Sequence, residues 1–133
     1  MGERYLIDTC TVVKMLVGNY PEKALEFIAK VIDDEAIISF ITQIELLVAK
    51  PSGYEDLKTR EQFVNGAKIE YINSNIIDEA IYIRRTANIK LPDAIIAATA
   101  KHFDYTLISC NHHDFKKVTS LGVKYINPET DLI

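Results

Sequence analysis

Residues 91–115, LPDAIIAATAKHFDYTLISCNHHDF, predict a helix followed by a short buried strand and a polar turn. Pro92 suits the first turn of a helix, because its missing N–H would have no partner there. The small apolar residues after it continue the helix to about Phe103. The run TLIS, residues 106–109, predicts the strand. Helix and strand in direct succession favour an α/β fold.

The same alternation extends over the whole chain. Apolar residues at helical spacing predict the other helices, and short apolar runs predict the strands. The strands are expected at residues 4–8, 36–39, 69–72, 106–109 and 124–127, and the helices at 22–34, 41–49, 55–67 and 76–88, the last with Ser74 or Asn75 as its N-cap. This order predicts a mostly parallel, twisted sheet of roughly five strands with helices on both faces. No linker or repeat interrupts it, so residues 1–133 are predicted to form a single domain.

Three carboxylates interrupt or border apolar segments. Asp8 ends the run YLI, Glu45 lies inside FITQIELLVA, and Asp93 opens LPDAIIAATA. Acidic side chains are seldom buried unless something compensates their charge. For any one of them, a helix cap or a hydrogen-bonded carboxylate is a sufficient explanation, and the helix dipole favours it for Asp93. A shared divalent metal ion explains all three together.

These acids are expected to meet at one edge of the sheet. In open α/β sheets the ligand site lies beyond the carboxyl ends of the strands. Asp8 ends the first predicted strand, and polar residues follow the fourth. We predict that the catalytic residues are Asp8, Glu45, Asp93, Asn111 and Asp114, and that the metal ligands are Asp8, Glu45, Asp93 and Asp114.

The residue types at this site indicate the metal and the reaction. Clustered carboxylates repel one another unless a cation lies among them. Oxygen ligands without cysteine or histidine favour Mg²⁺, with Mn²⁺ as a substitute. Such an ion can activate a bound water and neutralise the leaving oxygen, as phosphodiester hydrolysis requires. Asn111 could be a neutral oxygen ligand or hold a metal-bound water. His112 and His113 are expected in a surface turn, with a general-base role as the alternative.

Composition excludes some classes of protein. The net charge is −4, with 19 acidic and 15 basic residues, which argues against a high-affinity, non-specific nucleic-acid binder but not against a nuclease. No apolar run approaches the length of a membrane span, and MGERYLIDTC lacks the features of a signal peptide. We therefore expect a cytoplasmic protein without a membrane segment. Cys10 and Cys110 are expected to be buried, reduced thiols, and oxidation to a disulfide is the alternative.

The chain resembles the PIN-domain ribonucleases, and in particular the VapC-type toxins of prokaryotic toxin–antitoxin systems. The resemblance covers nearly the whole length and lies in LIDTC, ITQIELL, AIYIRR, the block LPDAIIAATAKHFDYTLISCNHHDF and GVKYINP. The block from Leu91 to Phe115 is the most specific part, because it joins the acid, a small-residue helix, a strand and an N-x-x-D-F ending at the family's spacing.

The resemblance implies a three-layer α/β/α fold and a site with three near-invariant acids, which here are Asp8, Glu45 and Asp93. Asn111 falls on the family's fourth acidic position, which leaves the number of bound metals open, and Asp114 is the following acid. The resemblance further implies metal-dependent hydrolysis of RNA, a homodimer and inhibition by a cognate antitoxin protein. Thr9 and Ser109 match small hydroxyl residues near the acids, and the cations that could line the groove or simply face solvent are Lys14, Arg84, Arg85, Lys90, Lys116 and Lys117.

Other readings of the same residues are weaker. LIDTCTV is similar to the aspartyl-nucleophile motif of haloacid-dehalogenase-like phosphatases, but Cys10 stands where they need a second aspartate. A receiver domain would need an aspartate after the third strand, where this chain has IEYINSN. The rival from another class is a catalytically inactive PIN-like module that binds RNA or acts as a scaffold. Asn111 favours that rival, and the retained acids weigh against it.

Overall fold

The structure is a computed structural model that describes residues 2–48 and 54–132. Residue 49 of the predicted helix 41–49 and the two terminal residues of the predicted domain 1–133 lie outside these ranges. Within them, strands and helices alternate as the sequence predicts. No helix in the described ranges has the length and apolar character needed to cross a lipid bilayer.

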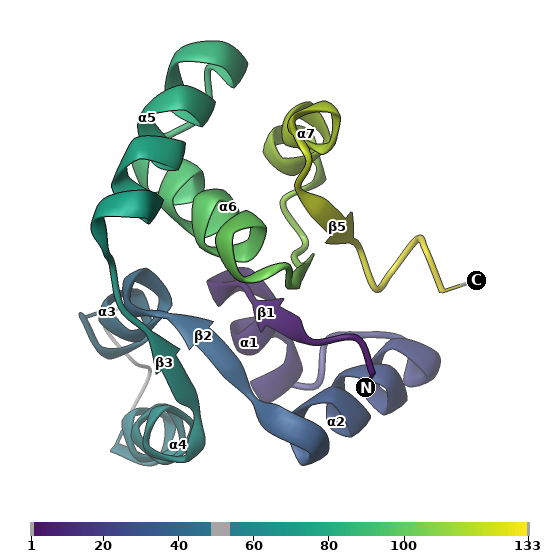
Figure 1. Cartoon of the computed structure of the whole chain (residues 1–133). Helices are drawn as coiled ribbons and strands as arrows, with labels where there is room; N and C mark the ends of the chain where they lie inside the picture. Colours follow the sequence, from purple (N-terminus) through teal and green to yellow (C-terminus); the bar gives the residue numbers. More distant parts are fainter. Residues whose placement is uncertain (1, 49–53, 133) are drawn as a thin grey trace.

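All strand pairs in the structure are parallel. The strands β1 (Tyr5–Ile7), β4 (Thr106–Ile108) and β5 (Lys124–Ile126) form a three-stranded sheet in the order β1-β4-β5. The strands β2 (Ile37–Ser39) and β3 (Lys68–Glu70) form a two-stranded sheet, and β2 lies beside β1 (Figure 1). The predicted parallel α/β fold is confirmed, with the sheet divided into three strands plus two.

The helices follow the strands along the chain. They are α1 (Thr9–Leu16), α2 (Glu22–Glu35), α3 (Phe40–Val48), α4 (Tyr54–Gly66), α5 (Ser74–Ala87), α6 (Leu91–Phe103), the short α7 (His112–Phe115) and the 3₁₀ helix η1 (Lys116–Leu121). The helix α1 was not predicted from its residues. The predicted N-cap of α5 is also wrong, because the side chain of Asn73, rather than Ser74 or Asn75, accepts the N–H of Ile76 at 2.8 Å.

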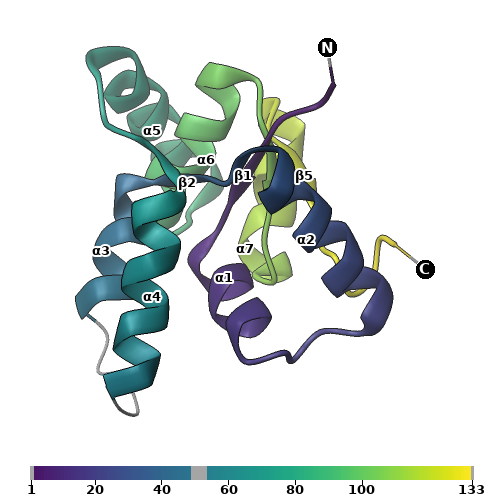
Figure 2. The same ribbon diagram turned by 90° about the horizontal axis from the view of Figure 1, so that it is seen from below.

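Consecutive strand residues point to opposite faces of the sheet. Leu6 and Leu107 are fully buried in a cluster with residues of α5, α6 and η1. Their neighbours Ile7 and Ile108 are buried in a second cluster with residues of α1, α2, α3 and α4. Helices therefore cover both faces, which gives the three-layer α/β/α arrangement (Figure 2). Parallel sheets are stable in this form because neither face is left in water.

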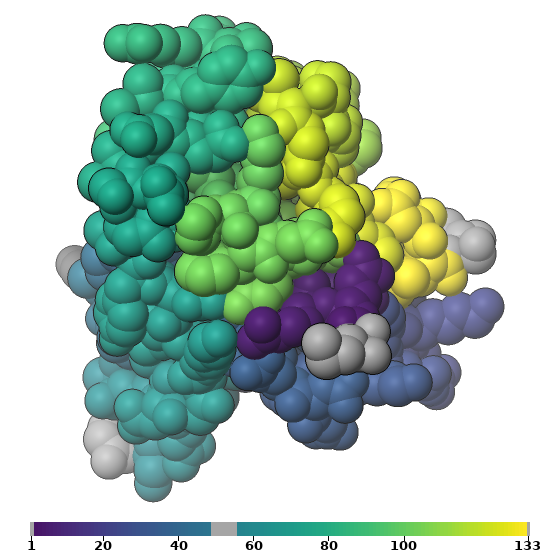
Figure 3. Space-filling view, viewed as in Figure 1, coloured from purple at the N-terminus to yellow at the C-terminus, as the bar shows by residue number. Residues whose placement is uncertain are grey.

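The C-terminal segment returns to the N-terminal half of the molecule. Pro128, Glu129 and Leu132 line a pocket with the first residues of α2, and Figure 3 shows this segment in yellow beside the purple N-terminal strand. Glu129 forms an ion pair with Lys14 of α1. The segment therefore lies close to the helix that begins directly after β1.

Candidate active site

Asp8 is fixed at the carboxyl end of β1. It is 5% exposed, and it is the N-cap of α1, because its Oδ1 accepts the backbone N–H of Thr9 at 2.9 Å. Its Oδ2 accepts a 2.8 Å hydrogen bond from the hydroxyl of Ser109, which follows the neighbouring strand β4. Both carboxylate oxygens are therefore hydrogen-bonded, so the cap explanation considered for a single acid holds for Asp8. It does not preclude a metal, since each oxygen has a further lone pair.

Asp93 lies in the first turn of α6, as predicted, and is partly buried. The side-chain amide of Asn111 joins it to Asp114: Nδ2 donates to Oδ2 of Asp93 at 3.3 Å and to Oδ2 of Asp114 at 3.1 Å. The Asn111 oxygen points the other way and accepts the backbone N–H of Asp114 as the N-cap of α7. In this arrangement the amide nitrogen of Asn111, rather than its oxygen, faces the two carboxylates, and the oxygen-ligand role stays a prediction. Its amide is a donor between two carboxylates.

Glu45 on α3 reaches the site through Thr9. The Thr9 hydroxyl donates to Oε1 of Glu45 at 2.7 Å and lies 3.0 Å from the hydroxyl of Thr42. Glu45 itself is exposed. Its position inside the apolar segment FITQIELLVA therefore does not bury it, and the neighbouring Ile44 and Leu47 are exposed as well.

The charges of these acids act on one another. Burial, followed by the charge of Asp8, raises the pKa of Asp93 to about 7, and the hydrogen bond with Asp114 and the charges of Asp114 and Glu45 act in the same direction. Burial raises the pKa of Asp8 above its usual range, although the hydrogen bonds from Ser109 and Thr9 oppose this. The pKa of Asp114 is lowered, chiefly by the hydrogen bond from Asn111. The carboxylates therefore share one electrostatic site.

This donor set fits a divalent cation chemically. Carboxylate oxygens are the ligands that Mg²⁺ and Mn²⁺ prefer, and a cation among these acids would remove the repulsion that raises the pKa of Asp93. In residues 2–48 and 54–132, however, no group of three or more His, Cys, Asp or Glu side chains is arranged to hold a metal ion. The four-carboxylate metal site therefore stays a prediction.

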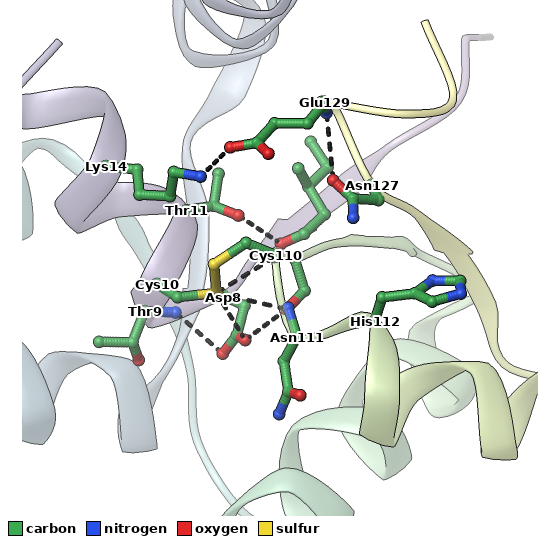
Figure 4. Close-up of a disulfide and its surroundings, with 12 residues drawn as sticks. Asp8, Thr9, Cys10, Thr11, Lys14, Cys110, Asn111, His112, Asn127 and Glu129 are labelled. Carbon is green, nitrogen blue, oxygen red and sulfur yellow. Dashed lines mark hydrogen bonds and ion pairs between the residues drawn. A yellow bond between two sulfur atoms is a disulfide. The ribbon is translucent and has the colours of Figure 1, made fainter. Parts of the chain in front are cut away.

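Three of the acids, Asp8, Glu45 and Asp93, face an open groove, and two lysines face it with them. The groove has a volume of about 490 Å³ and is lined by Asp8, Thr9, Cys10, Val13, Lys14, Glu45, Lys90, Pro92, Asp93 and Asn111. Its volume is within the range of ligand sites. Lys14 pairs with Glu129, a residue that the sequence analysis missed because nothing local links it to the site (Figure 4).

The other candidate cations and the histidines do not line this groove. Arg84 and Arg85 line a separate apolar pocket on α5, and Lys117 is 3.8 Å from Asp114. Lys116 is exposed on η1. His112 and His113 are exposed in the short helix α7. Their predicted surface position is confirmed, and the predicted turn is a short helix.

A disulfide lies beside the acids. Cys10 and Cys110 are joined, and both are partly exposed, so the expectation of two buried, free thiols is wrong. Cys10 is in the first turn of α1, and Cys110 follows β4. Because β1 and β4 are parallel neighbours, their carboxyl ends, and therefore both cysteines, lie at the same edge of the sheet (Figure 4).

Comparison with known proteins agrees with this fold. The PIN domain family model matches residues 5–121. No curated protein is significantly similar to the chain in sequence. Similar solved structures include a toxin–antitoxin complex from Klebsiella pneumoniae, with 24% identity, a TM-score of 0.72, and coverage of 93% of this chain and 97% of the other.

Two further structures extend the similarity. VapBC-1 from nontypeable Haemophilus influenzae has 21% identity and a TM-score of 0.74, with coverage of 93% of this chain and 97% of the other. DNA-bound VapBC from Salmonella typhimurium has 17% identity and a TM-score of 0.78, with coverage of 96% and 99%. At these identities the similarity shows a shared fold over nearly the full length of both chains.

Proposed function

Since the chain belongs to the PIN domain family, we propose that it is a metal-dependent endoribonuclease and the toxin of a VapC-type toxin–antitoxin pair. The observation that carries this proposal is the mutual influence of the acids in one groove. Burial is the largest cause of the raised pKa of Asp93, and the charges of Asp8 and Glu45 raise it further. A cluster of like charges weakens a fold unless a ligand cation compensates it, so such a cluster indicates a functional site.

Each acid has its own part in the proposed site. Asp8, Glu45 and Asp93 would hold Mg²⁺ or Mn²⁺. Asp114, which accepts a hydrogen bond from Asn111, would be the fourth carboxylate of the site. When bound, the ion supplies a Lewis acid that favours hydroxide over water and neutralises a phosphate oxygen. Ser109 and the N–H of Thr9 fix the orientation of Asp8.

Asn111 and the Thr9 hydroxyl orient the other carboxylates of the proposed site. Asn111 donates to Asp93 and Asp114, and Thr9 donates to Glu45. These bonds pre-organise the acids, so less freedom is lost when the cation and the substrate bind.

The groove also suits a nucleic-acid backbone. Lys14 and Lys90 line it beside the acids, and positive side chains at such a position contact phosphates and fix the strand. The resemblance to PIN-domain ribonucleases supports RNA as the substrate. With a net charge of −4, the chain has no general attraction for polyanions. Binding is therefore proposed to depend on these local lysines and to be strengthened by the cation.

Protein partners are proposed as well. The similar solved structures include toxin–antitoxin complexes, which supports a cognate antitoxin. The surface also carries apolar side chains that a partner would cover: Ile44, Leu47, Val48, Tyr71, Ile72, Ile77, Ile81, Tyr82 and Leu91 are exposed. We infer that a second copy of the chain, in a homodimer, and the antitoxin bury this surface. The proposed single domain of residues 1–133 would act in the cytoplasm.

The test is cleavage of total cellular RNA by the purified, antitoxin-free protein. We expect discrete fragments with Mg²⁺ or Mn²⁺, none with EDTA, and none from Asp93→Asn. The matched control is Asp104→Asn at the exposed C-terminal end of the same helix, where asparagine tolerates the left-handed backbone, and it should cleave as the wild type does. Cleavage by Asp93→Asn at the wild-type rate would exclude the proposed site.

The second candidate is an inactive module that binds RNA or serves as a scaffold, and the neutral Asn111 favours it. It predicts RNA binding without cleavage, and the same binding in EDTA and in Asp93→Asn. Folded protein that binds RNA in this way, with no fragments under any metal condition, would replace the nuclease proposal.

A further inference from the structure

The disulfide joins two segments that each carry part of the acid site. Cys10 and Cys110 are the chain's only cysteines, and they lie 100 residues apart in sequence with their Cα atoms 6.1 Å apart. Disulfides form over Cα separations of roughly 4.4–6.8 Å, so the backbone holds the two residues at a suitable spacing. Both are partly exposed, and Cys10 lines the groove, so a small reagent can reach the pair.

The sulfur of Cys10 lies among the groups that hold Asp8. It is 3.6 Å from Oδ2 of Asp8 and 3.5 Å from the hydroxyl of Ser109, and it accepts the backbone N–H of Cys110 at 3.1 Å. Cys110 itself stands between Ser109, which donates to Asp8, and Asn111, which donates to Asp93. The bridge therefore links the segment of Asp8 to the segment that positions Asp93 (Figure 4).

We propose that Cys10 and Cys110 are a reversible thiol–disulfide site whose redox state sets the metal affinity of the neighbouring carboxylates. The inference rests on the proposed metal site, and it does not depend on RNA as the substrate. The co-reactant is a small-molecule disulfide of the glutathione class. In reducing compartments, disulfides of this kind are transient and redox-sensing rather than structural.

The exchange balances in two steps. One cysteine sulfur, having lost its proton, attacks the small disulfide and forms a mixed disulfide, and the first half of the reagent leaves as a thiol with that proton. The second cysteine then attacks its partner's sulfur, which forms the Cys10–Cys110 bond and releases the second half as a thiol. The protein loses two electrons and two protons, and the reagent gains both.

The oxidised form binds the cation more tightly, for two reasons. In the disulfide, the Cys10 sulfur has no proton, whereas a thiol at 3.6 Å can donate to Oδ2 of Asp8 and compete with the metal. The bridge also restrains the backbone on either side of Cys110, so less freedom is lost when the carboxylates order around the ion. Oxidation thus strengthens the site, and reduction weakens it.

The experiment measures Mn²⁺ binding by titration calorimetry to the whole chain in two states. One sample is equilibrated with oxidised glutathione and the other with a phosphine reductant, and the mass after alkylation counts the free thiols in each. We expect no free thiol in the oxidised sample and two in the reduced sample. The Kd for Mn²⁺ should be lower in the oxidised sample by roughly tenfold, which is the lower end of the affinity changes caused by substitutions around metal ligands.

Two double variants separate the causes. Cys10→Ser/Cys110→Ser keeps a donor near Asp8, and Cys10→Ala/Cys110→Ser removes it. The Kd for Mn²⁺ should not change with reductant in either variant. If the donor competes with the metal, the alanine variant should bind Mn²⁺ more tightly than the serine variant. The wild-type comparison needs no substitution, so a variant that fails to fold does not decide the result.

RNA cleavage in the same samples separates this proposal from the nuclease proposal. Two free thiols after oxidation, or equal Kd values in the two states, would overturn the redox site, whatever the RNA result. A lower Kd in the oxidised sample with no RNA cleaved in either state would support the redox site and contradict the ribonuclease. Absence of Mn²⁺ binding in both states would overturn both proposals.

Discussion

The hydroxyl of Ser109 donates a 2.8 Å hydrogen bond to Oδ2 of Asp8 and accepts the backbone N–H of Asn111 at 2.9 Å. Asp8 and Ser109 follow the paired residues Ile7 and Ile108 of neighbouring parallel strands. Ser109 is fully buried, so water does not replace either bond. One hydroxyl thus holds Asp8, the first acid of the site, and Asn111, the residue that connects Asp93 and Asp114.

Replacement of Ser109 by alanine should destabilise the protein and weaken its metal site. A buried carboxylate oxygen that loses its donor costs about 1–3 kcal/mol. The pKa of Asp8 should rise further, because the Ser109 hydrogen bond lowers it. Urea unfolding would measure the loss, with the exposed Ser120→Ala as the control, expected within about 0.5 kcal/mol of wild type. Equal stability of the two variants would contradict the role of this bond.

Glu45 offers a test of the metal site that spares the core, because it is exposed. A metal at 100 times its Kd should raise the free energy of unfolding by about 2.7 kcal/mol, and a tenfold weaker Kd leaves about 1.4 kcal/mol at the same concentration. We expect Glu45→Gln to show this reduced stabilisation by Mg²⁺ or Mn²⁺, with stability in EDTA no lower than that of the wild type, because the substitution removes the repulsion with Asp8 and Asp93. The exposed Glu61→Gln on α4 is the control and should keep the full effect. A full effect in Glu45→Gln would remove Glu45 from the ligand set.

The stability of the metal-free protein should fall as the pH rises through neutrality. The pKa of Asp93 is raised from 3.8 to about 7, so its protonated form stabilises the fold fully below about pH 4, and this contribution is lost as the pH rises toward 7. At about 1.36 kcal/mol per unit, the contribution has an upper limit of about 4 kcal/mol, which water in the open groove reduces. The raised pKa of Asp8 acts in the same direction.

Denaturation in EDTA between about pH 5 and pH 8 would measure this dependence. Asp93→Asn should flatten the curve, while Asp104→Asn should keep the wild-type slope. Added Mg²⁺ should also flatten it, because the cation favours the ionised carboxylate. A wild-type curve that is already flat in EDTA would show that Asp93 does not carry a proton at neutral pH.

The segment that fixes the fold was predictable because its signals are local. Pro92 in the first turn of α6 and the small apolar residues after it specify a buried helix, and β4 follows as a short apolar run. The first helix, α1, was missed because its residues TCTVVKML include β-branched side chains that are also typical of strands. Its N-cap, Asp8, was predicted to end a strand, and no helix was predicted to follow it directly.

That Asp8, Glu45 and Asp93 meet in one groove was predictable, but their surroundings were predictable only in part. The surroundings of Glu45 show why: its apolar neighbours face outward, and a sequence cannot distinguish an apolar surface for a partner from an apolar core. The pairing of Cys10 with Cys110 depends on which strands are neighbours in the sheet, and a separation of 100 residues carries no local signal for that. The same holds for the contact between Lys14 and Glu129.

Lys90 should contribute to RNA binding. It is exposed, precedes α6 as its N-cap and lines the groove beside Asp93. If it contacts one phosphate, Lys90→Ala should weaken binding of single-stranded RNA at low salt and reduce the slope of log K against log salt by about 0.7. Binding should be measured with EDTA present, so that RNA is not cleaved. Lys30→Ala, exposed on α2 away from the groove, is the control. Identical slopes in both variants would place Lys90 outside the RNA path.

Reduction of the disulfide should lower stability without any change in sequence. A bridge that closes a loop of 100 residues restricts the unfolded chain, which in the chain-entropy model stabilises the fold by about 4.7 kcal/mol. We therefore expect the urea midpoint of the wild type to fall when a phosphine reductant is added. The slope of the transition should rise, because an unfolded chain without the bridge exposes more surface. Cys10→Ser/Cys110→Ser is the control: its midpoint should lie near that of the reduced wild type and should not respond to the reductant. A wild-type midpoint that is the same with and without reductant, after alkylation has confirmed two free thiols in the reduced sample, would mean that the two segments keep their positions without the bridge.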